Sequence, residues 1–282
     1  MLQQNEVVVR LGFFFGILLL MFIWELFAPK RQLSVSKTKR WISNLSIVVI
    51  DSAVTRLLFP AAAVGVAIYA QQNNMGLFNH MLHLNYWLTV IFSVIILDFA
   101  IYLQHVMFHA IPLFWRVHRM HHVDLDFDVT TGIRFHPIEI ILSLFIKFCV
   151  IILLGAPALG VLIFEVLLNA SSMFNHGNIR IPFVLDKIIR WIVVTPDMHR
   201  IHHSDIPNET NSNFGFNFSI WDRVFGTYTD QPRLGHEKMT IGIKAIRECK
   251  YCINLLGMLW IPFIRENREY PINRKNAVAK DD

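Results

Sequence analysis

The sequence predicts an all-α integral membrane protein: a helical bundle of about four or five apolar spans with a cytoplasmic, histidine-rich helical cap. Three observations lead to this prediction. Hydrophobic residues make up 54% of the 282 residues and charged residues only 17%, whereas a typical soluble domain is about a quarter charged. The mean hydropathy is +0.43. Long uncharged runs recur along the chain, and about 20 apolar residues are enough for one helix to cross a bilayer.

The first two spans are predicted at residues 7–28 and 44–70. Between them, the segment from Lys30 to Arg40 is rich in Lys and Arg, so the positive-inside rule assigns this loop to the cytoplasm. The first run does not resemble a signal peptide, because it lacks a basic n-region and a small-residue cleavage site. Asp51 and Arg56 interrupt the second span. They indicate either an ion pair within the bundle or a functional site.

A polar loop at residues 71–85 separates the second span from the third. We expect this loop on the outer side of the membrane, with His80 and His83 as ordinary interfacial residues. The apolar run at 87–109 is long enough to return the chain to the cytoplasmic side.

Two shorter apolar runs follow, at residues 138–154 and 158–175. Helices of this length reach only about 26 Å, so two full spans and a re-entrant hairpin both fit. Either arrangement returns the chain to the cytoplasmic side. A last apolar stretch, residues 253–264, is short, and we expect it on the membrane surface or packed against the bundle.

Two copies of the pattern H-R-x-H-H stand in this apolar chain, and "QHVMFH" adds a third histidine pair. With 13 His in the chain, chance would give roughly 0.03 copies of H-x-x-H-H. Histidines three or four residues apart share one face of a helix. A zinc site takes four ligands, and a catalytic zinc three plus water, so eight imidazoles fit two metal ions, each with an open position. The three boxes supply these candidate ligands: His105, His109, His118, His121, His122, His199, His202 and His203.

Three further histidines need separate interpretations. His176 follows an apolar run, so it points back toward the boxes, and we predict it as an additional ligand. His136 precedes Pro137 and is predicted equally as a ligand or as an outer partner of one. His236 is expected to be an ordinary surface or core residue.

Carboxylates flank the boxes and could balance the charge of two bound cations. A ligating histidine usually donates its other N–H to such an outer partner. Asp98, Asp197 and Asp222 are predicted in this role, whereas a solvated loop is an equally good interpretation of the aspartates that follow the first H-R-x-H-H box. The flanking carboxylates are Asp98, Asp124, Asp126, Asp128, Asp197, Asp205 and Asp222.

These motifs resemble the signature blocks of the fatty acid hydroxylase superfamily, which includes sterol desaturases, C-4 methylsterol oxidases and relatives of alkylglycerol monooxygenase. The resemblance covers roughly residues 90–230. It implies a metal-ligand role for the eight box histidines, and His176 matches a further histidine of the family. The matching blocks, in family order, are "LDFAIYLQHVMFH", "FWRVHRMHH", "TTGIRFHPIE", "FNHGN", "TPDMHRIHHS" and "NFGFNFSIWDRVFGTY".

The chain departs from the family at one point. Some lipid hydroxylases of the family carry a further histidine pair before the last box, whereas here His176 stands alone, with Ser172 and Arg180 four residues to either side. One metal site then lacks a ligand, or water or Asn178 completes it.

We divide the chain into N-terminal transmembrane helices at 1–86, a fatty acid hydroxylase-like catalytic domain at 87–230, and a C-terminal cytoplasmic tail with a short apolar helix at 231–282.

Imidazole binds iron, zinc, copper and nickel, so the ligands alone do not identify the metal. The resemblance implies two iron ions (Fe2+/Fe3+) with O2 as co-substrate, and hydroxylation or desaturation of a sterol, fatty acyl chain, alkyl glycerol or carotenoid. Zinc lacks the redox chemistry that such C–H bonds require. A membrane metallohydrolase is one alternative, although the chain lacks H-E-x-x-H and no glutamate adjoins a box. A metal transporter, the other alternative, needs ligands along a pore near mid-bilayer.

The reaction implied by the resemblance consumes electrons, and the sequence contains no G-x-G-x-x-G fingerprint, haem domain or Fe–S cysteine set. We therefore expect a separate electron-donor protein, attracted by Lys and Arg within 180–250.

Cys249 and Cys252 form a lone C-x-x-C and are interpreted as ordinary thiols. The net charge of +5 suits anionic lipid, and no basic stripe with aromatics indicates nucleic acid. The sequence favours the bacterial inner membrane over the endoplasmic reticulum.

Overall fold

The computed structural model describes residues 2–80, 82, 84–265 and 272. His83 and most of the segment after residue 265 lie outside this part, so the expectations for them stay untested. Within the described residues the chain is all helices and loops, with a few isolated β-bridges. Five stretches are long and apolar enough to cross a membrane: Asn5–Phe27, Lys37–His80, Tyr86–Ala110, Pro137–Leu154 and Ala158–Asn175. The all-α fold with apolar spans is therefore confirmed, and the chain is an integral membrane protein.

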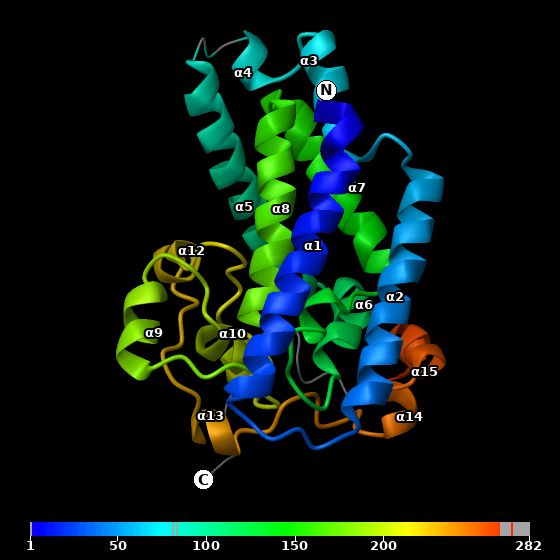
Figure 1. The fold of residues 1–282 in the computed structure, drawn as a ribbon, viewed down its shortest axis with the longest axis vertical. Coiled ribbons are helices and arrows are strands. Elements are labelled where there is room, and N and C mark those ends of the chain that lie inside the picture. The colour runs from blue at the N-terminus through cyan, green and yellow to red at the C-terminus, as the bar shows by residue number, and fades with distance from the viewer. Residues whose placement is uncertain (1, 81, 83, 266–271, 273–282) are drawn as a thin grey trace.

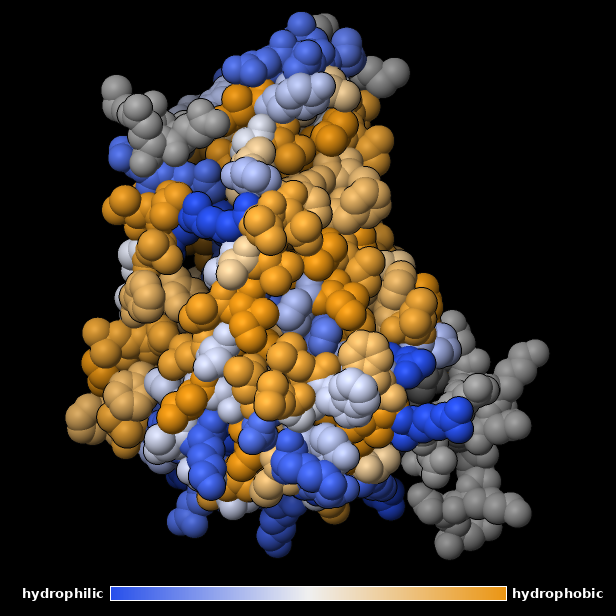
Figure 2. Space-filling view, turned by 90° about the vertical axis from the view of Figure 1, so that its right-hand side faces the viewer, coloured by the Kyte–Doolittle hydropathy of each residue, from blue (hydrophilic) through white to orange (hydrophobic). Residues whose placement is uncertain are grey.

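The long helices run side by side and alternate in direction (Figure 1). Helix α1 packs along α8, and α5 packs along both α7 and α8. Many apolar side chains point outward from this bundle, and Figure 2 shows them as a broad orange band between two bluer ends. An apolar exterior of this kind faces lipid chains rather than water. The bundle helices are α1 (Leu2–Phe27), α2 (Lys37–Leu58), α3 (Ala62–Gln72), α5 (Tyr86–Ala110), α7 (Pro137–Leu154) and α8 (Ala158–Asn175).

The second span differs from the prediction of one run at 44–70. The helix stops at Leu58 and restarts at Ala62, because Pro60 offers no N–H and its ring clashes with a preceding carbonyl. The predicted ion pair between Asp51 and Arg56 is also wrong: Asp51 is buried with one carboxylate oxygen unpartnered, whereas Arg56 is exposed. Five residues turn a helix by about 140°, so the two side chains leave α2 on different faces.

A short turn joins helices α7 and α8, which run antiparallel as a hairpin. Gly155 ends α7 with a φ of 67°, a conformation that suits glycine because it lacks a Cβ. A Cβ at this position would lie 2.3 Å from the carbonyl oxygen of Met75, so the turn also needs glycine to pack on the loop before α4 (Leu77–His80). Each helix of the hairpin has 18 residues and is long and apolar enough to cross a membrane.

Shorter helices collect at one end of the bundle, opposite α3 and α4 (Figure 1). The apolar stretch at 253–264 packs against α2 and α6 and buries Met258 and Ile261 completely. Of its two predicted locations, the one packed against the bundle is therefore confirmed. The elements of this cap are α6 (Pro112–His122), η1 (Thr131–Ile133), α9 (Phe183–Ile189), α10 (Pro196–His202), α11 (Pro207–Thr210), α12 (Ile220–Val224), α13 (Gly235–Lys238), α14 (Cys249–Cys252), α15 (Leu255–Trp260) and η2 (Ile261–Phe263).

Candidate metal centre

The ends of four helices carry the nine histidines predicted as ligands. The first box lies in the last turns of α5, and His176 caps the C-terminus of α8. The second box closes α6, which a proline at its first position separates from α5. The third box lies on α10, whose N-terminus is capped by the hydroxyl of Thr195. Histidines far apart in sequence therefore meet where the bundle joins the cap.

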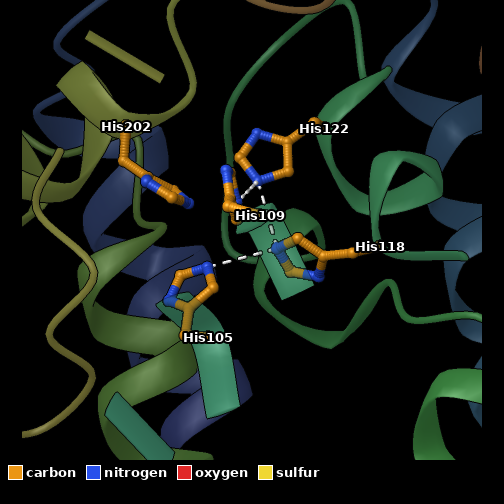
Figure 3. Close-up of side chains that lie close together, drawn as sticks. All are labelled: His105, His109, His118, His122 and His202. Atoms are coloured by element: carbon orange, nitrogen blue, oxygen red, sulfur yellow. Dashed lines mark hydrogen bonds between the residues drawn. The ribbon is translucent and has the colours of Figure 1, made fainter. Parts of the chain in front are cut away.

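The nine imidazoles form two buried groups, and within each group the candidate ligand atoms lie within 4.8 Å of one another. We call them the five-histidine group and the four-histidine group. Figure 3 shows the five-histidine group, in which the rings point toward a common centre. The five-histidine group consists of His105, His109, His118, His122 and His202, and the four-histidine group consists of His121, His176, His199 and His203.

Each H-R-x-H-H box is divided between the two groups. His118 and His122 enter the five-histidine group while His121 enters the other. The third box does the reverse: His199 and His203 enter the four-histidine group and His202 the five-histidine group. The three histidines of a box, although close together on one helix, therefore do not act as a single chelator. An i, i+4 pair faces one centre and the i+3 histidine turns toward the second, which couples the two groups.

The Nε2 atoms are spaced as a first-row metal ion requires. Neighbouring Nε2 atoms lie 3.1–3.2 Å apart, as in the His105–His118, His109–His122 and His121–His176 pairs. Metal–nitrogen bonds of about 2.1 Å would place two ligands at right angles about 3.0 Å apart. Lone pairs at this distance repel unless a cation or a proton lies between them. The donor set and its spacing therefore fit a metal ion in each group.

The opposite ring nitrogens have partners that fix the tautomer. Nδ1 of His105 lies 2.8 Å from the carbonyl oxygen of Phe214, and Nδ1 of His202 lies 2.7 Å from that of Ser212. Nδ1 of His121 lies 3.1 Å from the carbonyl oxygen of Arg134. A carbonyl only accepts hydrogen bonds, so these Nδ1 atoms carry the proton. Their Nε2 lone pairs then face the common centres, as metal ligation requires.

Burial keeps these imidazoles neutral. The nine side chains are at most 4% exposed. Desolvation lowers the pKa of His118 and of His176 to about 3, because a charged ring is penalised in a medium of low dielectric constant. At neutral pH both rings therefore offer a free lone pair to a metal ion.

The loop after the second box is buried and held by charge. Arg40 donates to both carboxylate oxygens of Asp124 at 2.7 Å and to Asp128 at 2.6 Å, and Asp126 accepts from the backbone of Ser34. All three aspartates are buried, so the interpretation of this loop as solvated is wrong. The network fixes the loop that presents the Arg134 carbonyl to His121.

The outer residues predicted from sequence act at a distance from the imidazoles. Asp222 accepts from the N–H groups of Phe214 and Gly215, and so positions the carbonyl that His105 contacts. Asp98 does not contact His105; it accepts from the backbone of Asn217 and Phe218 and from Trp221, and so fixes the same loop.

Three other predicted outer residues lie elsewhere. Asp197 pairs with Lys30 and Arg200. Asn178 hydrogen-bonds both backbone groups of Arg31, so it does not complete the four-histidine group as one prediction had it. His136 caps α7 and contacts the Leu259 carbonyl, outside both groups. The reason is local: each side chain is already engaged in capping a helix or tying the chain that follows α1.

Sequence reasoning missed two polar partners. Nδ1 of His118 lies 2.6 Å from Oε1 of Glu139, and Nδ1 of His109 lies 3.1 Å from Oδ1 of Asn211. No glutamate adjoins a box in the sequence, but Glu139 contacts the second box in the folded chain, although it lies 21 residues from His118. The signal that could have identified it is an acidic residue in the first turn of a span that is otherwise almost entirely apolar.

His80 and His236, which were not predicted as ligands, stay apart from the centre. His80 is exposed on α4 at the other end of the bundle, and His236 lies 3.9 Å from Asp197. Cys249 is exposed and Cys252 is buried, and neither joins a metal-binding group among the described residues.

A cavity of about 280 Å³ reaches from the five-histidine group into the bundle. His105, His118 and Glu139 form its inner end, and Phe108 and Ile101 belong to its apolar wall. A partly apolar cavity beside a few buried polar groups is the usual form of a small-molecule site.

Comparison with known proteins identifies the domain that carries this centre. Residues 90–227 match the fatty acid hydroxylase family model. The chain is 31% identical over 187 residues to ornithine lipid hydroxylase OlsE of Rhizobium tropici, covering 66% of this chain and 54% of that protein. It is 27% identical over 183 residues to alkylglycerol monooxygenase of Xenopus tropicalis, covering 63% and 38%. With human cholesterol 25-hydroxylase the identity is 26% over 144 residues, covering 49% and 50%.

The chain thus spans about half the length, or less, of the curated relatives it matches. No solved structure matches it significantly. The family model covers all three histidine boxes and His176, which are the residues that form the two groups. The chain therefore carries a fatty acid hydroxylase domain and belongs to the fatty acid hydroxylase superfamily.

Proposed function

We propose that this protein is a membrane-bound non-haem di-iron oxidoreductase that uses O2 to hydroxylate or desaturate a lipid. The observation that carries the proposal is the pair of buried histidine groups at the inner end of a cavity within the bundle. The five histidines of one group and the four of the other would each hold one iron. Three relatives are named as hydroxylases or monooxygenases, two of them of lipids or sterols, which supports the same class of reaction.

The reaction balances with an external reductant. Hydroxylation consumes a C–H bond, O2, two electrons and two protons, and yields an alcohol and water; desaturation consumes two C–H bonds and yields an alkene and two waters. Bound iron would supply the O2 activation that no side chain can. The chain itself would exclude water, hold the imidazoles neutral, and orient His118 through Glu139.

The two electrons would come from a separate donor protein. We propose that this donor docks on the cap, where residues 180–250 include exposed basic side chains that would attract an acidic partner. The positive-inside rule, applied to the Lys- and Arg-rich segment between α1 and α2, favours a cytoplasmic location for this end. We propose the bacterial inner membrane as the location. The exposed basic side chains are Arg180, Lys187, Arg233, Lys238, Lys244, Arg247 and Lys250.

The two alternatives are less well supported. A transporter would need ligands distributed along a pore, whereas the described histidines of both groups collect at one end of the bundle. A metallohydrolase needs a carboxylate that acts as a general base, whereas the contact of Glu139 with Nδ1 of His118 is that of a residue that orients a ligand.

The test uses the full chain purified from membranes. We expect bound iron and lipid-dependent O2 consumption, both lost in His121→Ala and retained in His236→Ala. Substrate-dependent hydrolysis in the absence of O2 would instead support the metallohydrolase. Equal O2 consumption by the two variants would contradict the proposal.

A further inference from the structure

A polar stripe runs along α7 on the wall of the cavity. Glu139, Ser143 and Lys147 are spaced four residues apart in a helix that is otherwise almost entirely apolar, so they lie on one face. All three line the cavity. Eight residues of helix span about 12 Å, so the stripe leads from His118 deep into the membrane-spanning part of the bundle.

The far end of the stripe is a three-helix charge cluster. Nζ of Lys147 lies 2.9 Å from Oε1 of Glu165 on α8, and Nη1 of Arg10 on α1 lies 2.9 Å from Oε2 of the same carboxylate. Glu165 is 3% exposed. Charges inside a membrane are costly and mark a functional site by default. This cluster also lines the cavity, so it can meet a ligand there.

The lining of the cavity also includes acceptors without partners. Oε1 of Gln104, Oε2 of Glu139 and Oδ1 of Asp51 are buried and make no hydrogen bond, and all three side chains line the cavity. A buried polar atom without a partner costs free energy. A ligand bearing an N–H or O–H donor would remove this cost, whereas a pure hydrocarbon would not.

The cavity also continues toward the lipid. A second cavity, of about 360 Å³, shares Arg10, Ser52, Thr55, Leu144 and Glu165 with the first and reaches Phe59 and Pro60 at the end of α2. On the side of the molecule that lies to the right in Figure 1, hydrophilic atoms interrupt the orange apolar band (Figure 2). A lipid could therefore reach the charge cluster sideways from the bilayer.

We propose that the cavity binds an amphiphilic lipid by its polar group. The polar group, an amide or a hydroxyl, lies at the cluster of Arg10, Lys147 and Glu165, and the C–H bond to be oxidised lies about 12 Å away, beside His105 and His118. An amide or hydroxyl both donates and accepts hydrogen bonds, which matches a wall that offers two cations and several unpartnered acceptors. The oxidation step of this inference rests on the proposed function, whereas the binding of the lipid does not.

A purely structural role of the cluster is the competing explanation, since Glu165 also ties α1 and α7 to α8. The test therefore measures binding of three chains of equal length: palmitamide, hexadecanol and hexadecane. Each probe competes with radiolabelled palmitamide for the full-length protein in nanodiscs, with and without added iron. We expect palmitamide and hexadecanol to bind at least about tenfold more tightly than hexadecane, because hydrogen bonds to charged groups are worth this much.

Lys147→Met should remove this preference by weakening the two polar probes about tenfold while leaving hexadecane unchanged. Lys39→Met, at an exposed position of α2, is the control for loss of one positive charge. Ser143→Ala leaves the ion pairs intact and should reduce the preference in part, which keeps the test valid if Lys147→Met does not fold. Equal binding of all three probes, or equal weakening of all three by Lys147→Met, would overturn the proposal.

The two proposals fail separately. If the polar probes bind as expected but the iron-loaded protein with a reductant forms no oxidised product, the proposed function is wrong and the binding site stands. If products form from hexadecane as readily as from palmitamide, the enzyme class stands and the amphiphile proposal is wrong.

Discussion

His121 and His122 are consecutive residues whose imidazoles serve different groups. Their ring centroids lie 5.4 Å apart and their planes cross at 89°. Nε2 of His122 lies near those of His109 and His118, whereas Nε2 of His121 lies near that of His176. Successive helix residues point about 100° apart. The C-terminus of α6 therefore lies between the two groups and contributes ligands to both.

This relationship predicts different metal losses in the two alanine variants. His121→Ala would leave three imidazoles in the four-histidine group, and His122→Ala would leave four in the five-histidine group. The affinity of a site for its ion falls as the number of donor atoms falls. His121→Ala should therefore lose more iron than His122→Ala. Metal analysis of the two purified variants, together with His236→Ala as a control, measures this difference. Equal iron loss in two folded variants would contradict the division into groups.

The carboxylate behind His118 gives a second prediction. Glu139 accepts from Nδ1 at 2.6 Å, which fixes the ring and makes Nε2 a better donor. Glu139→Leu should lower iron affinity about 10–100-fold, and Glu139→Gln should lower it less because its amide oxygen still accepts. Titration against a chelator compares them. Glu237→Gln, at an exposed side chain, is the matched control, and an affinity that is the same for Leu and Gln would contradict an orienting role.

The number of spans and the helical boxes were predictable because both depend on local patterns. Apolar runs of membrane-spanning length identified α1, α5, α7 and α8 to within a few residues at most ends. The i, i+3, i+4 spacing identified the shared helix faces of the histidines. These signals need no knowledge of which segments meet in space.

The missed features depend on tertiary contacts. Glu139 meets His118 only because α7 packs beside α6, and Asp124 meets Arg40 only because the loop after α6 folds onto α2. The division of each box between two groups also depends on where α8 and α10 bring His176 and His199. No local spacing indicates which of two centres a histidine faces.

The lowered pKa values of two histidines predict acid instability of the metal-free protein. Burial lowers the pKa of His118 and His176 from 6.5 to about 3, so below pH 6.5 the unfolded chain binds more protons than the folded one. The stability contributed by the neutral rings is complete above pH 6.5 and is lost as the pH falls toward 3, by about 1.4 kcal/mol per pH unit for each ring.

Thermal unfolding of the chelator-treated protein in detergent between pH 5 and 8 measures this dependence. The melting temperature should be level above about pH 7 and fall below it. His80→Ala, which removes an exposed histidine, should leave the curve unchanged. A melting temperature that does not fall between pH 6.5 and pH 5 would show that the buried rings do not stay neutral as described.

The last prediction concerns the buried Arg40, which holds the loop that contacts His121. Arg40 is fully buried and holds Asp124 and Asp128 through charge-assisted hydrogen bonds of 2.6–2.7 Å. Arg40→Met would leave two carboxylates buried without their main partner, which typically costs about 3–5 kcal/mol. The neighbouring Lys39→Met changes the same charge at an exposed position of the same helix and should cost almost nothing.

Arg40→Met should also weaken metal binding by the four-histidine group. The loop from Asp124 to Arg134 presents the carbonyl that His121 contacts, so loosening this loop should free the His121 ring first. Arg40→Met should therefore show a large fall in melting temperature and a loss of iron that resembles His121→Ala rather than His122→Ala. If Arg40→Met unfolds at the same temperature as Lys39→Met, the network does not stabilise the loop, and the support of His121 must come from Arg134 alone.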